Sequence, residues 1–376
     1  MTPNLQQRQR GFTVTEMMVA ALIGLFLLAG AVSMLVSTRR TYNVQTDLSR
    51  IQENARFTMD MMQRDIRMAG YFGCHNSLNN VQNQLNGATG GKLYDSTSPL
   101  EGLEQGAAGW APSNNTADAV VANRGGTNEG DSVAQNDATL IAGSDAITIR
   151  RLSGTSWAVT ADMAGPGDDV QILHNITDGV SLQAGDIVAV SDCSATDIVA
   201  LTQVPAVGAT GGLKHAVGAG DKGNSVATLS KRYDKTARVS PVVFVRYYVG
   251  RTTLDGSVEP ALFRQTLNQG DLLTQKLIDG VESMQITYGV DTNGDKIPDT
   301  YVPANDGQLG NSTTNWDRVA AVRVALLLRS PTAVDVDIDE NTYTVNGQEM
   351  FGGASPDDRR RRRVIMTTIF VRNDTR

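Results

Sequence analysis

The sequence has few of the residues that mark metal sites and thiol chemistry, and few aromatic side chains. Its 376 residues include two cysteines and three histidines, and aromatic residues make up 5 % of the chain. The histidines, His75, His174 and His215, lack zinc-like spacing, and no pattern pairs one of them with a cysteine for catalysis. With 37 glycines, the composition favours a β-rich domain with long loops over a dense helical core.

Signatures of catalysis are also missing. The chain has no Gly-x-Ser-x-Gly elbow, no Ser/Lys signature and no motif for a metal-activated water, so we predict that it is not an enzyme. The formal net charge of −7 argues against DNA binding, which requires a basic surface.

One long apolar run is present, from Met17 to Val36. About 20 helical residues cover roughly 30 Å, the thickness of the hydrocarbon core of a bilayer. Arg8 and Arg10 precede the run, which places the N-terminus in the cytoplasm and the bulk of the chain outside. Because no A-x-A-like site follows Val36, we expect the run to be retained as a single membrane span.

A carboxylate lies at the start of this span. Burying Glu16 in the membrane would cost on the order of 2.5 to 3.5 kcal/mol, and such a charge is usually tolerated only with a partner or a function. The position of Glu16 therefore predicts a specific interaction.

The residues from Gly11 to Glu16, Gly-Phe-Thr-Val-Thr-Glu, follow a basic leader and resemble the class III signal of type IV pilins and of the related pseudopilins of type II secretion. The resemblance implies that residues 1–11 are a leader, that a prepilin peptidase cuts after Gly11, and that Phe12 is then N-methylated. It also implies that Glu16 pairs with the terminal amine of a neighbouring subunit during assembly. The alternative is a simple signal anchor that carries one carboxylate.

An amphipathic segment follows the membrane span. Apolar residues at spacings of three and four predict one buried stripe, and Asp60 and Arg64 stand at i,i+4 in the favourable order for an ion pair. Gly70 is a helix-stop signal. We therefore expect one helix over 12–70, with its membrane part at about 17–36. The stripe comprises Leu48, Ile51, Ala55, Met59, Met62, Ile66 and Ala69.

Residues 53–74 resemble a subgroup of the type IV minor pilins that is related to the J-type pseudopilins. This likeness implies a structural subunit that primes pilus assembly, sits at the tip and supports twitching motility and adhesion. Its implied partners are other minor pilins, the major pilin, the prepilin peptidase and the inner membrane. The implied location is a single-pass inner-membrane protein with a periplasmic head, later exposed on the surface pilus. Alternatives are a J-type pseudopilin and a tip adhesin or ligand-binding module on a pilin mount.

The rest of the chain divides by composition. Residues 71–145 are rich in Asn, Gly, Ser and Thr and predict a loop-rich insertion with at most short strands. Residues 146–376 predict a β-rich globular head. The resulting fold class is α+β, a long helix packed on an antiparallel sheet. The residues 271–280 are interpreted as one short helix. The strand candidates are 146–151, 169–173, 186–191, 197–203, 241–249, 261–266, 284–290, 319–329 and 364–372.

Cys74 and Cys193 are the only cysteines. In an oxidising periplasm such a pair readily forms a disulfide, which here would close a loop of about 120 residues. Two independent buried thiols are the alternative.

The most chemically suggestive stretch runs from Asp291 to Asp299. Asp291, Asn293, Asp295 and Asp299 place side-chain oxygens at positions 1, 3, 5 and 9, and the carbonyl of Ile297 is available at position 7, as in calcium loops. Position 6 is lysine and position 12 is valine, so the loop is not an EF-hand. The sequence leaves open a structural calcium site or an ion-free, Asx-rich hairpin turn.

Five arginines, residues 359–363, precede the last strand candidate. They are interpreted as a solvated strand edge whose charge discourages aggregation. The alternatives are phosphate contacts, as with DNA, or an anchor for an acidic neighbouring subunit.

Overall fold

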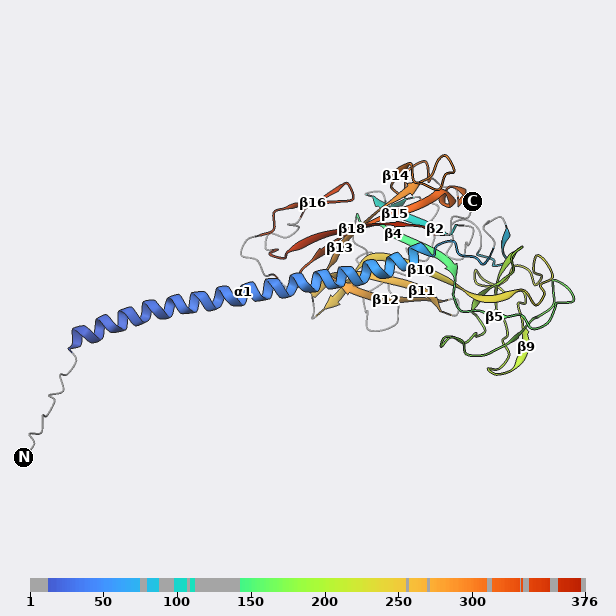
Figure 1. Ribbon diagram of the computed structural model, residues 1–376, viewed down its shortest axis with the longest axis horizontal. Coiled ribbons are helices and arrows are strands. Elements are labelled where there is room, and N and C mark those ends of the chain that lie inside the picture. Colours follow the sequence, from blue (N-terminus) through green and yellow to red (C-terminus); the bar gives the residue numbers. More distant parts are fainter. Residues whose placement is uncertain are drawn as a thin grey trace, which may run out of the picture.

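The computed structural model describes residues 13–74, 80–87, 98–106, 109–111, 143–254, 257–268, 271–309, 313–331, 333, 338–351 and 358–372. Gly11, Phe12 and His75 lie outside the described residues, as does most of the segment 76–145. Within the described part, one very long helix carries a β-rich head at its C-terminal end (Figure 1).

Helix α1 (Val14–Arg67) is 54 residues long, which corresponds to about 80 Å. No proline interrupts it. Its N-cap is Thr13, whose side chain accepts a hydrogen bond from the backbone N–H of Glu16. Its C-cap is Met68, two residues before Gly70, which adopts a φ of 75° that glycine tolerates best.

The strands of the described residues form four sheets. The largest has the order β1-β8-β7-β10-β4-β2-β3, with β11, β12 and β5 attached, and the second has the order β14-β13-β15-β18. Neighbouring strands are antiparallel except β1 and β8, which are parallel. The bounds are β1 (Val81–Asn83), β2 (Leu100–Gly106), β3 (Gly109–Ala111), β4 (Ala146–Leu152), β5 (Trp157–Ala158), β6 (Val170–Leu173), β7 (Ile187–Ser191), β8 (Thr196–Ala200), β9 (Thr210–Leu213), β10 (Arg238–Leu254), β11 (Ser257–Asn268), β12 (Asp271–Asp279), β13 (Val281–Val290), β14 (Thr300–Val302), β15 (Val319–Arg329), β16 (Thr342–Val345), β17 (Gln348–Phe351) and β18 (Arg362–Phe370), with a short 3₁₀ helix at Thr313–Arg318.

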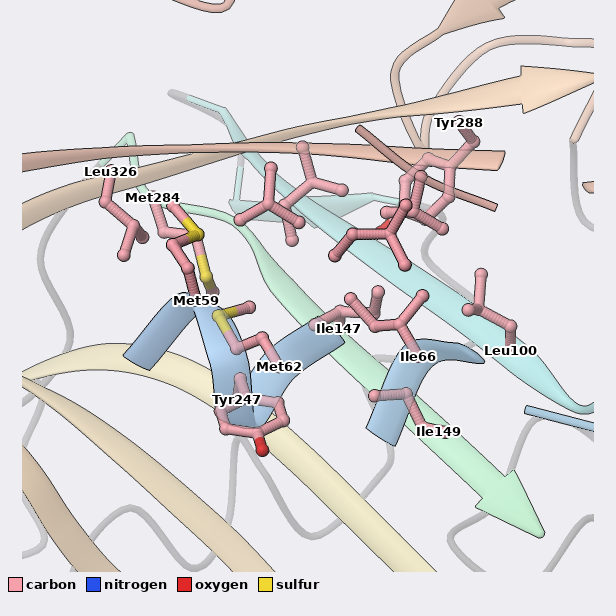
Figure 2. Close-up of a cluster of buried hydrophobic side chains, with 14 of the residues drawn as sticks. Met59, Met62, Ile66, Leu100, Ile147, Ile149, Tyr247, Met284, Tyr288 and Leu326 are labelled. Carbon is pink, nitrogen blue, oxygen red and sulfur yellow. The ribbon is translucent and has the colours of Figure 1, made fainter. Parts of the chain in front are cut away.

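One face of the C-terminal half of α1 is buried between the two large sheets (Figure 2). Met62 and Ile66 are fully buried, and they share one core with Ile147 of β4 and Met284 of β13. Burying each such side chain contributes roughly 1.5 to 3 kcal/mol. The predicted stripe is therefore confirmed, except that Leu48 is only half-buried.

A second module, defined here as residues 153–240, lies at the end of the head farthest from the start of α1 (Figure 1). It has its own hydrophobic core, which includes Trp157, Ile172 and Tyr233. Strand β10 joins the module to the rest of the head, because its first residues pair with β5 and β7 and its later residues pair with β4 and β11. The two units thus share one continuous strand.

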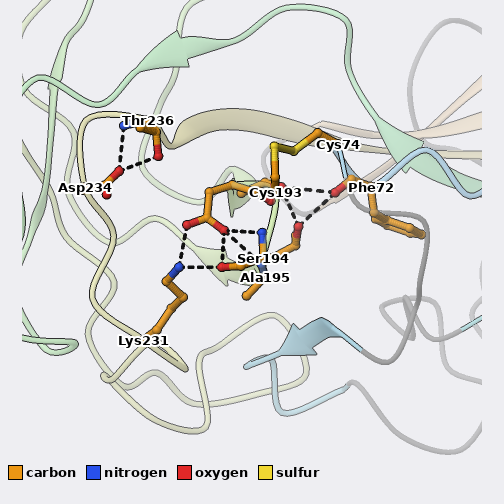
Figure 3. The surroundings of a disulfide bond; sticks show 11 residues. Phe72, Cys74, Cys193, Ser194, Ala195, Lys231, Asp234 and Thr236 are labelled. Carbon is orange, nitrogen blue, oxygen red and sulfur yellow. Dashed lines mark hydrogen bonds and ion pairs between the residues drawn. A yellow bond between two sulfur atoms is a disulfide. The ribbon is translucent and has the colours of Figure 1, made fainter.

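The residues that follow α1, from Phe72 to Cys74, are held against the second module by several contacts (Figure 3). The carbonyl of Phe72 accepts hydrogen bonds from Thr196 Oγ1 at 2.9 Å and Ser191 Oγ at 3.3 Å. Gly73 has a φ of 113°, and a Cβ there would lie 2.3 Å from Ser191 Oγ. Only glycine fits this close approach. One residue later, Cys74 forms a disulfide with Cys193.

The residues beside Cys193 stabilise the turn that carries the disulfide. One carboxylate oxygen of Asp192 accepts hydrogen bonds from the backbone of Ser194 and Ala195, and the other lies 2.6 Å from Lys231 Nζ. Burial alone would raise the pKa of Asp192, but Lys231 and these hydrogen bonds lower it to about 2. The predicted disulfide is therefore present in a fixed local frame.

The α+β class is confirmed, and all nine strand candidates correspond to strands. The helix is, however, packed between two sheets instead of across one. The predicted short helix at 271–280 is wrong, because Asp271–Asp279 is β12, which pairs along its length with β11. Its apolar spacing suits either structure, and the neighbouring strand decided between them. Strands β1, β2 and β3 fall within 71–145.

We expect the double variant Cys74→Ser/Cys193→Ser to lose about 3 to 5 kcal/mol of unfolding free energy, because the disulfide closes a loop with a sequence separation of 119. The measurement is denaturant unfolding of the full chain in detergent. Reductant should lower the wild-type midpoint to that of the double variant and leave the variant unchanged. Equal midpoints for the oxidised wild type and the variant would contradict a stabilising role.

Candidate functional site

The N-terminal half of α1 presents an exposed apolar surface. Every described residue from Thr13 to Asn43 is exposed. The helix is long and apolar enough to cross a membrane, and its most apolar 18-residue window has a mean hydropathy of 2.6 and no buried residue. Such a surface in water would be unfavourable, so it requires lipid or other helices around it. The predicted span is thus a free, continuous helix.

Glu16 is the third residue of α1 and interacts with the residue that caps the helix. Its Oε2 accepts hydrogen bonds from the backbone N–H of Thr13 at 3.0 Å and from Thr13 Oγ1 at 2.8 Å. These contacts form a capping box. Within a single subunit, Glu16 therefore has a local partner. Its pairing with the terminal amine of a neighbour, and the processing roles of Gly11 and Phe12, stay predictions.

A buried charge anchors the last turn of α1 in the head. Asp65 accepts hydrogen bonds from Tyr247 Oη at 2.7 Å, from Arg264 Nη2 at 3.2 Å and from Arg151 Nη2 at 3.2 Å. These partners belong to β10, β11 and β4. Burial and the neighbouring Asp65 carboxylate raise the pKa of Tyr247, which keeps its hydroxyl protonated as a donor. The sequence offered one sign of this anchor, an acidic residue beside Ile66 of the apolar stripe, but Asp65 is not among the predicted site residues.

The arginine run contributes to a network of ion pairs inside the head. The side chain of Arg362 is 1 % exposed and contacts Glu282, Asp339 and Asp358. Arg360 makes two hydrogen bonds to Glu259, at 2.9 and 3.0 Å. Because residues 360 and 362 alternate along an extended chain, their side chains reach the same network. The interpretation of the run as a solvated strand edge is wrong for Arg360 and Arg362. Their guanidinium groups form ion pairs with carboxylates of the head itself.

The predicted calcium loop is the hairpin connection between β13 and β14. The buried carboxylate of Asp291 accepts backbone hydrogen bonds from Asn293, Gly294 and Lys296. The backbone N–H of Asp295 donates to the Asn293 side chain, that of Ile297 donates to Asp295, and Asp299 accepts from Thr292. Among the described residues, no group of three or more His, Cys, Asp or Glu side chains is placed to hold a metal. Calcium binding stays a prediction.

The two described histidines lie in the second module and contact its backbone. His174 is buried, with Nδ1 2.6 Å from the carbonyl of Pro205, and its Nε2 accepts a hydrogen bond from the backbone N–H of Leu182 at 3.1 Å. His215 Nε2 lies 3.2 Å from the carbonyl of Asp168. Both rings therefore interact with the backbone of nearby loops.

Two family profiles match the chain. The profile described as "Prokaryotic N-terminal methylation motif" covers residues 6–32, and the profile described as "Type IV Pilus-assembly protein W" covers residues 246–373. No curated protein and no solved structure matches. The methylation motif, the membrane-length helix and the β-rich head define a type IV pilin-like protein.

Within that class, the chain is similar to the PilW family of minor pilins over residues 246–373. This family is structural and not an enzyme class. The matched segment 246–373 begins in β10 and contains the whole of the second sheet, which packs on α1. The second module lies outside both matched segments.

We expect Glu104→Gln to stabilise the head at neutral pH. Glu104 is buried, and burial raises the pKa of its carboxyl despite a hydrogen bond from the backbone of Ala304. A raised folded-state pKa means that stability falls as pH rises from the ordinary glutamate value through the raised one. The uncharged amide of the glutamine variant does not ionise, so the variant does not lose stability in this pH range.

The measurement is the thermal midpoint of both proteins as a function of pH. The variant should be the more stable at pH 7, and the difference should disappear in acid. The matched control Glu349→Gln changes an exposed carboxylate and should have no effect. A lower midpoint for Glu104→Gln at pH 7 would contradict the assigned cost of burial.

For the loop, we expect calorimetry of the full chain to show calcium binding that is weakened in Asp291→Asn/Asp295→Asn. These substitutions remove charge but keep one oxygen acceptor for the hydrogen bonds of the turn. Asp234→Asn, in an exposed turn of the second module, is the control and should not change the titration. An absence of binding heat at millimolar calcium would contradict the calcium site and support the ion-free hairpin turn.

Proposed function

We propose that this minor pilin joins other minor pilins and the major pilin, primes pilus assembly and sits at the pilus tip. The observation that carries the proposal is the division of α1. One half is a free apolar span, and the other half is fixed in the head by burial and by Asp65. Such a helix can bundle with those of other subunits while the head keeps a constant orientation.

The position of the second module supports a place at the tip. The module extends the head at the end far from the start of α1 (Figure 1). An extra module there is accommodated most easily where no further subunit has to stack above it. Twitching motility and adhesion would follow from the role in assembly.

The same proposal covers processing and location. The prepilin peptidase cuts after Gly11 and methylates Phe12, the span holds the chain in the inner membrane, and the head lies in the periplasm until the subunit enters the surface pilus. Glu16 then exchanges its contact with Thr13 for the terminal amine of a neighbour, an attraction that is stronger in a low dielectric than in water.

The test counts surface pili and measures secreted enzyme activity in a strain that lacks the gene. We expect the deletion to lose pili and retain secretion, and the wild-type gene to restore pili. A complementing Glu16→Ala gene should yield processed protein that enters pili poorly. The control Glu53→Ala removes an exposed acid from the same helix and should restore pili. Intact pili with lost secretion would move the protein to a pseudopilus.

A further inference from the structure

A groove of about 760 Å³ lies between the last two turns of α1 and the C-terminal end of β18. Its two walls are joined at one end, where the backbone N–H of Arg372 donates to the carbonyl of Arg67 at 3.1 Å. The groove is formed by the region in which the helix meets the second sheet, and it is separate from the apolar span and from the calcium-like loop.

Three arginines line this groove, namely Arg64, Arg67 and Arg372. All three are exposed, and within the described residues none of them forms an ion pair. The ion pair expected between Asp60 and Arg64 is not formed, although Asp60 is the one carboxylate in the lining. The groove is therefore locally cationic on a protein whose net charge is −7. This charge complements an anionic partner.

The β18 wall is the edge of a sheet. In the described part of the chain, β18 pairs with β15 alone, so its other side has no neighbouring strand. Phe370 and Met366 are each 58 % exposed on this strand. An open edge with apolar side chains is a template for an additional strand.

Two other anionic partners fit less well. Arg64 lies 28 residues beyond Val36, which places it about 40 Å along the helix from the end of the membrane span. Lipid head groups are therefore out of reach. A nucleic acid would use the arginines but would gain nothing from unpaired backbone amides and carbonyls on a strand edge. A polypeptide with carboxylate side chains uses both features.

We propose that the groove binds an acidic, extended segment of another pilin subunit, which pairs with the open edge of β18 while its carboxylates contact Arg64, Arg67 and Arg372. This inference rests on the proposed function, because it takes the partner from the same assembly. The proposed role of these three arginines differs from that of Arg360 and Arg362, which form ion pairs within the head.

The experiment places a photoreactive benzophenone amino acid at position 370 of the full chain in the complemented deletion strain. Ultraviolet light should yield an adduct with a different pilin, mapped by mass spectrometry to a segment rich in Asp and Glu. Arg64→Glu/Arg67→Glu should reduce the adduct roughly tenfold. Arg64→Lys/Arg67→Lys should retain it in large part, since the charge is kept.

The matched control is Lys235→Glu/Arg251→Glu, which reverses two exposed charges elsewhere on the head and should leave the adduct unchanged. Thermal unfolding of each purified full-length variant checks that folding is intact. No adduct, an adduct only with a second copy, with lipid or with DNA, or an adduct insensitive to Arg64→Glu/Arg67→Glu would overturn the inference. If pili require the gene but form normally with that variant, only the groove assignment fails. If pili do not require the gene, the proposed function fails.

Discussion

The burial of the second half of α1 between two sheets is the constraint on which the rest of the molecule depends. Every described residue of the first half is exposed and outside the core, so the direction of this half is set by how the second half is held. Met62 and Ile66 share one core with both sheets, and Asp65 adds hydrogen bonds to three strands, two of them from arginines. A buried carboxylate is costly unless it is well paired. Its partners therefore fix the rotation of the helix as well as its depth.

The residues after the end of the helix connect it to the second module, so the module is also held in place relative to α1. Phe72 packs beside β7 and β8, its carbonyl accepts two hydroxyl hydrogen bonds, and Cys74 is covalently joined to Cys193. Strand β10 provides a separate connection. The disulfide and the shared strand both attach the module to the rest of the head, which restricts its rotation relative to α1.

Arginine has two different uses in this head. Arg329, Arg360 and Arg362 lie in an internal network with carboxylates, where they join the end of β15 and the start of β18 to β11 and β13. Arg64, Arg67 and Arg372 line a surface groove. Sequence alone could not separate the two groups, because both consist of arginines near helix or strand ends. The distinction depends on whether a carboxylate from a distant strand arrives within reach.

The sequence by itself determined the local features of this protein: the membrane-length run, the methylation motif, the amphipathic stripe of α1 and the position of nine strands. Each of these is encoded in the spacing of neighbouring residues, and spacing is sufficient where the chain interacts mainly with itself or with lipid. Only the tertiary structure decided that residues 271–279 form a strand, that α1 is enclosed by two sheets, that Asp65 is its anchor and that Arg362 is buried. These outcomes depend on partners between about ten and about two hundred residues away along the chain, and no local pattern records which distant segment arrives.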